Sequence, residues 1–137
     1  MTMYAQWAKS IGNTNTNSNG LIATDSNGNV YVTGKFKGNM GIGGTTLTND
    51  GTNFDVYLTK YNTSGTAQWA TSFGGVNNDF GQSITTDSNG NVYVTGRFTG
   101  NMNISGTTLT SQGSDDLFIV KYNTSGTVQW STSFGST

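Results

Sequence analysis

The 137-residue chain has a net charge of −1, and charged residues make up 9% of it, against roughly 25% in an average soluble domain. Its six Lys and Arg residues are scattered, which argues against nucleic acid as a partner because phosphate binding needs clustered cations. No apolar run approaches the roughly 20 residues needed for membrane insertion. Cys, His and Glu are absent, so thiol chemistry, the common zinc ligands and the usual general base are missing, and we expect no cofactor, metal site or catalytic site.

In chain order, the first recognisable segment is a tryptophan strand that returns twice. Gln-Trp-x-x-Ser, followed by Ile or Phe and then Gly, occupies residues 6–12, 68–74 and 129–135. The three tryptophans are 62 and 61 residues apart, which indicates two full repeats and one additional leading strand. The N-terminus lacks the charged and apolar regions of a secretory signal, so we expect that a signal was removed or that the chain is an excerpt.

The next segment, DSNGNVYVTG, occurs letter for letter at residues 25–34 and 87–96. Asn27-Gly28 and Asn89-Gly90 predict type I′ hairpin turns, and the flanking residues are largely β-branched, aromatic or threonine. The same turns faintly resemble a calcium loop, which would need several carboxylates. Because a single Asp opens each turn, we favour an Asx turn in which that side chain caps its own backbone.

The remainder of each repeat also predicts strands. Matched apolar residues in the Gly- and Thr-rich connections 38–51 and 100–113 indicate packed loops. The third strands, Asp55–Tyr61 and Asp116–Tyr122, are apolar on both faces and are predicted to lie between sheets. Asn-Thr-Ser-Gly turns follow, then the tryptophan strand. No segment has helical spacing, so the fold class is all-β, with four short antiparallel strands per repeat as in a β-propeller blade.

These motifs resemble the bacterial and archaeal β-propeller repeat family called SBBP. The resemblance rests on Asp-x-x-Gly-Asn-Val-Tyr-Val-Thr-Gly-x-Phe, Asp-x-Phe-x-x-Lys-Tyr and Gln-Trp-x-x-Ser-Phe-Gly, and it covers nearly the whole chain. It implies an extracellular or cell-surface location and no shared enzymatic activity. The expected divisions are an extra outer-type strand at 1–12 and blades at 13–75 and 76–137. The first copy departs from the pattern, with Asn17-Ser18-Asn19 in place of Asp79-Phe80-Gly81.

Two blades cannot close a propeller, because rings typically have about four to eight. Either two, three or four chains assemble, with three chains and six blades favoured, or the chain is cut from a longer array. The surplus strand at residues 4–11 suggests exchange between subunits, which would propagate a filament if it does not close. The alternative is that one end is frayed.

The candidate assembly residues are the aromatic side chains of the tryptophan strands and the hairpin turns. They are Trp7, Trp69, Trp130, Phe73, Phe134, Asn27, Gly28, Asn89 and Gly90. We interpret the aromatic residues as filling between blades, with sugar stacking as the alternative. The sequons beginning at residues 62, 103 and 123 permit glycosylation, although Asn-Thr-Ser-Gly is also good turn chemistry.

Two further pairs of residues bear on function. Lys60 and Lys121 are expected to lay their stems along apolar surface and reach solvent. Asp115 and Asp116 point to opposite faces of a strand and cannot form a catalytic dyad. We therefore predict a non-enzymatic, self-assembling structural module forming a homo-oligomer, with a lectin-like propeller that binds glycans between blades as the alternative.

Overall fold

The computed structural model describes residues 5–12, 17–49 and 52–137. These ranges contain twelve strands and no helix, hence no helix able to cross a membrane. The strands are β1 Asn17–Thr24, β2 Val30–Phe36, β3 Met40–Ile42, β4 Thr45–Leu47, β5 Asp55–Tyr61, β6 Ala67–Gly75, β7 Phe80–Thr86, β8 Val92–Phe98, β9 Asn101–Ile104, β10 Thr107–Thr110, β11 Asp116–Tyr122 and β12 Val128–Phe134. The all-β prediction is confirmed.

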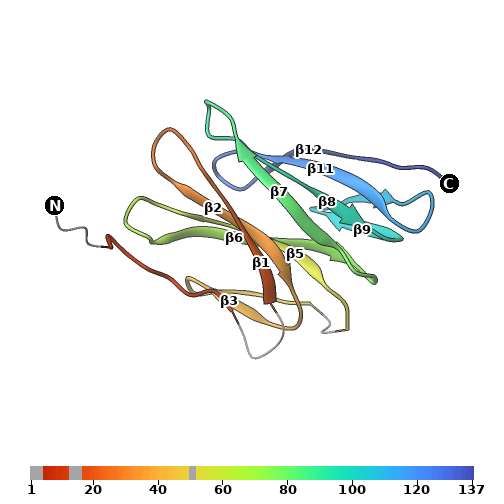
Figure 1. Ribbon diagram of the computed structural model, residues 1–137, viewed down its shortest axis with the longest axis horizontal. Helices are drawn as coiled ribbons and strands as arrows, with labels where there is room; N and C mark the ends of the chain where they lie inside the picture. The colour runs from red at the N-terminus through yellow and green to blue at the C-terminus, as the bar shows by residue number, and fades with distance from the viewer. Residues whose placement is uncertain (1–4, 13–16, 50–51) are drawn as a thin grey trace.

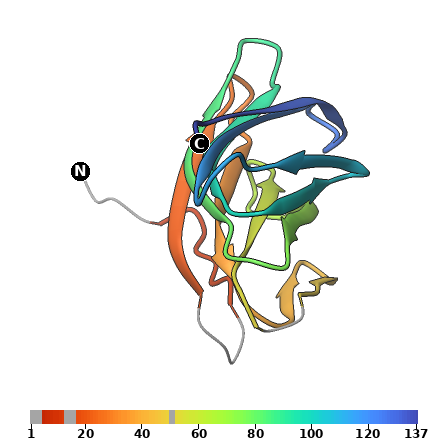
Figure 2. The ribbon, with the colours of Figure 1, turned by 90° about the vertical axis from the view of Figure 1, so that its right-hand side faces the viewer.

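Each repeat forms an antiparallel meander of four longer strands. The first has the order β1-β2-β5-β6, and the second has the order β7-β8-β11-β12. We call them the first and second sheets; Figure 1 shows them packed against each other as two layers, and Figure 2 turns the pair by 90°. The β9–β10 hairpin of the second repeat joins the end of β6, where Gly74 pairs with Asn103 and Gly75 pairs with Met102.

The predicted packed connections are short hairpins whose apolar side chains are buried. The strands β3 and β4 pair in one repeat, and β9 and β10 pair in the other. Their side chains Met40, Ile42, Leu47, Met102, Ile104 and Leu109 are each at most 9% exposed. The prediction is therefore confirmed for the described part of the connections, while residues 50 and 51 lie outside the described residues.

The turn type predicted for the Asn-Gly pairs is wrong. A type I′ turn needs positive φ at both central residues, and of each pair only the glycine has it, at 79° for Gly28 and 78° for Gly90. The Gly28 N–H instead donates to the Asp25 carbonyl at 3.0 Å, so the central residues are Ser26 and Asn27. The repeated Asx-x-x-Gly turn that begins at Asn62 has the same hydrogen bond, from Gly65 to Asn62 at 3.0 Å.

The core consists of two apolar clusters, one on each side of the first sheet. One lies between the two sheets, and the other lies between the first sheet, the β3–β4 hairpin and Ile11. The strand β5 is consequently buried on both faces, as predicted. The equivalent strand β11 is buried on one face only: Phe118 is fully buried, while Leu117 is 43% exposed. The prediction is wrong for β11 because, among the residues that the structure describes, no further sheet covers its second face.

Residues 5–12 do not form a regular strand. Gly12 alone joins a strand, through an isolated bridge to Gly41. The segment follows the side of the first sheet that faces away from the second (Figure 1). The predicted leading strand is thus absent from residues 5–12, and residue 4 lies outside the described residues.

Candidate protein–protein interface

The contact between the two sheets is the best-formed interface in the described part of the chain. The first sheet contributes Tyr31, Val56, Leu58 and Phe73, all at most 4% exposed. The second sheet contributes a larger set, Val92, Val94, Phe98, Phe118, Val120 and Tyr122, all at most 1% exposed. The Phe73 ring meets Phe118 edge-on, with centroids 5.6 Å apart. We call this contact the internal interface.

Polar contacts fix how the two sheets meet at the end where Thr124 lies. The Lys60 amine donates to the Thr124 carbonyl at 3.0 Å and to its hydroxyl oxygen at 2.6 Å. The Trp69 indole N–H donates to the same carbonyl at 3.1 Å. Lys60 is only 9% exposed, so the expectation that its amine reaches solvent is wrong: the second sheet supplies the acceptors that water would otherwise provide.

Trp69 lies in an aromatic notch on the second sheet. Its ring stacks on Tyr122 at 6.4 Å and 25°. A Cβ atom on Gly126 would come within 2.8 Å of the indole, and φ at this glycine is +82°. Glycine is therefore favoured at position 126 for two reasons: the backbone has a positive φ, and the Trp69 ring leaves no room for a Cβ atom.

Trp7 reproduces this arrangement on the first sheet. Its ring stacks on Tyr61 at 6.3 Å and 28°, and its indole N–H donates to the Thr63 carbonyl at 3.1 Å. A Cβ atom on Gly65 would come within 2.6 Å of the Trp7 ring. Trp7 and the three residues that it contacts each lie one repeat before their counterparts around Trp69. Residues 5–12 therefore occupy the place that the outer strand of a preceding sheet would take.

The far face of the second sheet is open. Leu117, Trp130 and Phe134 are 43%, 45% and 49% exposed. Tyr93 and Trp130 form a ring pair at 6.2 Å, just as Tyr31 and Trp69 do at 6.2 Å in the internal interface. We call this surface the trailing face; its residues are Tyr93, Leu117, Ile119, Lys121, Trp130 and Phe134.

The far face of the first sheet is partly covered. We call it the leading face and define it as Ile22, Val30, Val32, Tyr57, Tyr61 and Thr63. A hollow of about 380 Å³ lies between it and residues 7–11. Ile22 in this hollow is 66% exposed, whereas its repeat equivalent Ile84 packs against the core between the sheets.

The predicted assembly residues thus divide into two groups. The aromatic members occupy the internal interface or the two outer faces. Asn27, Gly28, Asn89 and Gly90 lie in hairpin turns, and of these turn residues Gly90 contacts the other sheet, because its carbonyl accepts a hydrogen bond from the Tyr31 hydroxyl at 3.2 Å. The sequence identified the aromatic residues, but not the partner of each.

The two Asp side chains that open the hairpin turns act as turn caps. Asp25 accepts the backbone N–H groups of Asn27 and Asn29, each at 3.0 Å. Asp87 accepts equivalent bonds, and those from Asn91 above all lower the pKa of Asp87 to about 2. Burial alone would raise the pKa of Asp25, but the bonds from Asn29, Tyr31 and Asn27 outweigh it, and the pKa is lowered. The described residues contain no group of three acidic side chains that could hold a metal ion.

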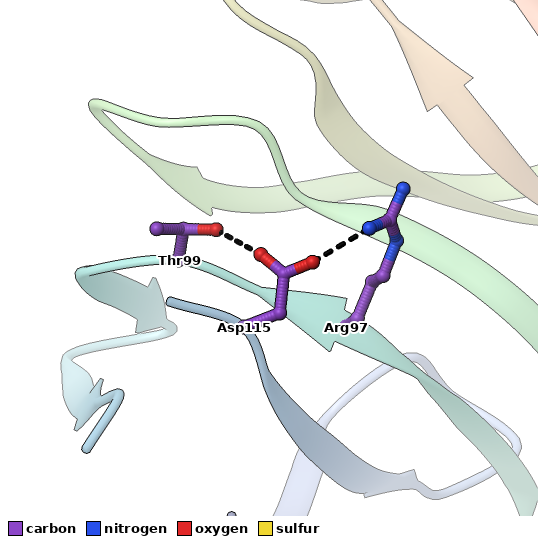
Figure 3. Close-up of polar contacts among 3 residues, drawn as sticks. All are labelled: Arg97, Thr99 and Asp115. Atoms are coloured by element: carbon purple, nitrogen blue, oxygen red, sulfur yellow. Dashed lines mark hydrogen bonds and ion pairs between the residues drawn. The ribbon is translucent and has the colours of Figure 1, made fainter. Parts of the chain in front are cut away.

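The neighbouring carboxylates Asp115 and Asp116 are separated as predicted. Asp115 is exposed and pairs with Arg97 at 2.6 Å, while Thr99 donates to its other oxygen at 2.5 Å (Figure 3). These bonds, from Thr99 first and Arg97 second, lower the pKa of Asp115. Asp116 is buried, at 2% exposure. The two carboxylates therefore do not form a dyad.

The structure gathers cations that the sequence scatters. The Lys35 amine lies 4.6 Å from the Phe54 ring and 4.8 Å from the Phe80 ring. Lys37 and Arg97 approach the same two rings, at 4.5 and 4.6 Å. Phe54 lies just before β5 of the first sheet, and Phe80 begins β7 of the second sheet. The spacing of these residues in the sequence does not predict that the two rings and three cations come together.

Asp79 is a buried carboxylate that sequence reasoning left without a role. It is fully buried, one oxygen accepts the Gly75 N–H at 2.8 Å, and the other has no hydrogen-bond partner. Burial, with a smaller contribution from the charge of Asp55, raises the pKa of Asp79 to about 7. The first repeat has Asn17 at the equivalent position.

Two repeated, consecutively paired antiparallel meanders packed in layers are an arrangement compatible with β-propeller repeats. The family model described as SBBP, beta-propeller repeat, matches residues 68–101, which run from β6 into β9 and so cross the junction between the two sheets. The resemblance to SBBP β-propeller repeats that was inferred from the sequence is therefore confirmed over these residues.

A second comparison finds a longer relative. The chain is 30% identical, over 155 aligned positions, to an uncharacterized WD repeat-containing protein of Acanthamoeba polyphaga mimivirus. The alignment covers 90% of the chain but 11% of the relative. The chain thus spans a small part of that protein's length.

Proposed function

We propose that this chain is a non-enzymatic, propeller-type protein-interaction module whose principal partner is a second copy of itself. One observation carries the proposal: the two outer faces repeat, in sequence, the two sides of the internal interface. The trailing face corresponds to the side of the first sheet that packs inward. The leading face corresponds to the side of the second sheet that packs inward.

The correspondence holds position by position. On the trailing face, Tyr93, Leu117, Ile119, Lys121, Trp130 and Phe134 stand for Tyr31, Val56, Leu58, Lys60, Trp69 and Phe73. On the leading face, Val30, Val32, Tyr57, Tyr61 and Thr63 stand for Val92, Val94, Phe118, Tyr122 and Thr124. A second copy that docks its leading face on this trailing face would therefore bury aromatic surface and offer Thr63 as an acceptor to Lys121.

Such docking is head-to-tail, and it closes when the rotation between sheets permits. With each four-stranded sheet as one blade, two to four chains supply the roughly four to eight blades of a ring, and we favour three chains. An open stack of the same contacts would be a filament. The name of the viral relative, a WD repeat-containing protein, is consistent with an interaction module, because WD repeats build propeller blades.

The test places a charge at the centre of the trailing face. In Leu117→Lys, an added ammonium group would be buried on docking, whereas Val76→Lys adds the same charge in the loop after β6, where Val76 is 73% exposed. Particle mass is measured by light scattering across a concentration series. We expect oligomers for the wild type and Val76→Lys, and single chains for Leu117→Lys. A wild type that remains a single chain at every concentration, or a Leu117→Lys variant with wild-type mass, would contradict the proposal.

A glycan-binding module is the second candidate, and one feature favours it. Ser105, Thr107, Gln129, Trp130 and Ser131 line a surface hollow of about 600 Å³, and hydroxyl and amide groups near an aromatic residue suit a sugar. The rings of Trp7 and Trp69 are stacked on tyrosines and are less available. A glycan array with wild type and Trp130→Ala tests this candidate: binding lost with the indole would support it, and no binding by the wild type would exclude it for the glycans on the array.

A further inference from the structure

The segment that precedes the first sheet occupies the surface that self-association would use. We infer that residues 5–12 form an intramolecular cap, and that Trp7 competes with Trp130 of a second copy for the notch formed by Tyr61, Thr63 and Gly65. The inference rests on the proposed function and adds a regulation to it: the chain limits its own assembly.

The notch accepts one tryptophan at a time. Trp7 already uses the Tyr61 ring, the Thr63 carbonyl and the space above Gly65. In the internal interface, Trp69 uses the equivalent three groups, Tyr122, Thr124 and Gly126. A docking copy presents Trp130 in the same sequence context, so Trp130 requires the groups that Trp7 occupies.

The cap is held by fewer contacts than the strand that it imitates. The strand β6 forms a ladder of six residue pairs with β5, which anchors Trp69. Residues 5–12 have one isolated bridge, and Ala5, Gln6, Ala8, Lys9 and Ser10 are exposed. A segment with few buried contacts and little backbone pairing opens more readily than a core strand, so a second copy can displace it.

The incoming strand also fills more space than the cap does. Phe134 of the second copy stands where the cap has Ile11, and the equivalent Phe73 packs edge-on against Phe118 in the internal interface. The hollow of about 380 Å³ beside the cap marks volume that residues 5–12 leave unfilled. Displacement therefore exchanges an incomplete cover for an aromatic one.

The competition has a definite sign. When a binding-competent state is only fractionally populated, the apparent dissociation constant rises by the inverse of that fraction. A substitution that weakens the cap, such as Trp7→Ala, therefore tightens self-association, even though it removes an aromatic side chain. If residues 5–12 were instead donated to another subunit, as strand exchange requires, the same substitution would weaken self-association.

The experiment compares dissociation constants of full-length variants by sedimentation velocity. We expect Trp7→Ala to lower the constant at least tenfold, Trp130→Ala to raise it at least tenfold, and Gln6→Ala, an exposed neighbour in the cap, to leave it unchanged. Trp7→Phe keeps a ring for Tyr61 but loses the indole N–H, and should fall between wild type and Trp7→Ala. Circular dichroism confirms that each variant is folded.

The contrary outcomes separate the two proposals. A Trp7→Ala constant equal to or above the wild-type value would overturn the cap while leaving self-association intact. Single chains for every variant, Trp7→Ala included, would overturn the proposed function and the cap together. Tightening by Trp7→Ala with no effect of Trp130→Ala would show that the notch has an occupant other than Trp130.

Discussion

Phe73 and Phe134 occupy the same position in the two repeats but meet different surroundings, and truncating each to alanine separates the internal interface from the open face. Phe73 is 4% exposed and meets the rings of Phe118 and Tyr122, with centroids 5.6 and 6.2 Å away. Phe134 is 49% exposed. Local sequence is almost identical around the two, so any difference in stability arises from the sheet that covers one and not the other.

The expected magnitudes follow from burial. Phe73→Ala leaves a cavity between the sheets and should lower the free energy of unfolding by about 3–5 kcal/mol. Phe134 is half exposed, so its truncation forfeits about half of the roughly 1.5–3 kcal/mol that full burial of an apolar side chain provides. We therefore expect Phe134→Ala to cost about 1 kcal/mol, leaving a gap of about 2–4 kcal/mol between the variants.

Urea unfolding followed by tryptophan fluorescence measures both values. The protein must be dilute enough to remain a single chain, since docking of a second copy would cover Phe134 and raise its cost. The wild type provides the reference midpoint and slope. Equal losses for Phe73→Ala and Phe134→Ala in single chains would refute the reasoning, because the internal interface would then contribute nothing to stability.

Two other substitutions test individual groups. The pKa of Asp79 is raised to about 7 in the folded chain, so its folded state favours the protonated form: the benefit is fully present below about pH 4, the ordinary range of an unfolded Asp, and is lost as pH rises through about 7. Asp79→Asn should remove this pH dependence and raise the unfolding free energy at pH 8 by up to about 4 kcal/mol. Urea titrations in which the unfolding free energy falls equally from pH 5 to pH 8 in the wild type and in Asp79→Asn would contradict this. Gly126→Ala should cost about 1–2 kcal/mol more than Gly106→Ala, because both glycines have positive φ but only at Gly126 does a Cβ meet a ring, that of Trp69; equal melting temperatures would disprove the close approach.

Much of the architecture follows from local sequence, and the departures have physical causes. Periodicity and Asx-x-x-Gly turns define strands within a repeat, so the repeat and its strands were predictable. The prediction of a type I′ turn was wrong because the Asp25 carboxylate accepts the Asn27 N–H and the Asp25 carbonyl accepts the Gly28 N–H. Gly28 is therefore the last residue of the turn rather than a central one.

The remaining departures depend on partners that a sequence does not place. Residues 5–12 share the pattern of β6, but β6 is a strand because it pairs with β5, whereas the cap has only the isolated Gly12–Gly41 bridge within the described residues. Lys60 and Lys121 have similar sequence surroundings, yet Lys60 alone meets Thr124. The repeat could be read from the sequence, while the neighbours of its first and last copies could not.

Cross-linking two chosen positions tests most directly whether copies dock through a repeat of the internal interface. The variant Lys121→Cys with Thr63→Cys carries the open-face equivalents of Lys60 and Thr124, and the chain has no cysteine to interfere. The matched control is Lys60→Cys with Thr124→Cys, which a short bis-maleimide should link within one chain. We predict that the first variant is linked between chains, in a ladder of discrete masses, and that neither single-cysteine variant is. Intrachain linking of the control with no interchain product from the first variant would contradict the account.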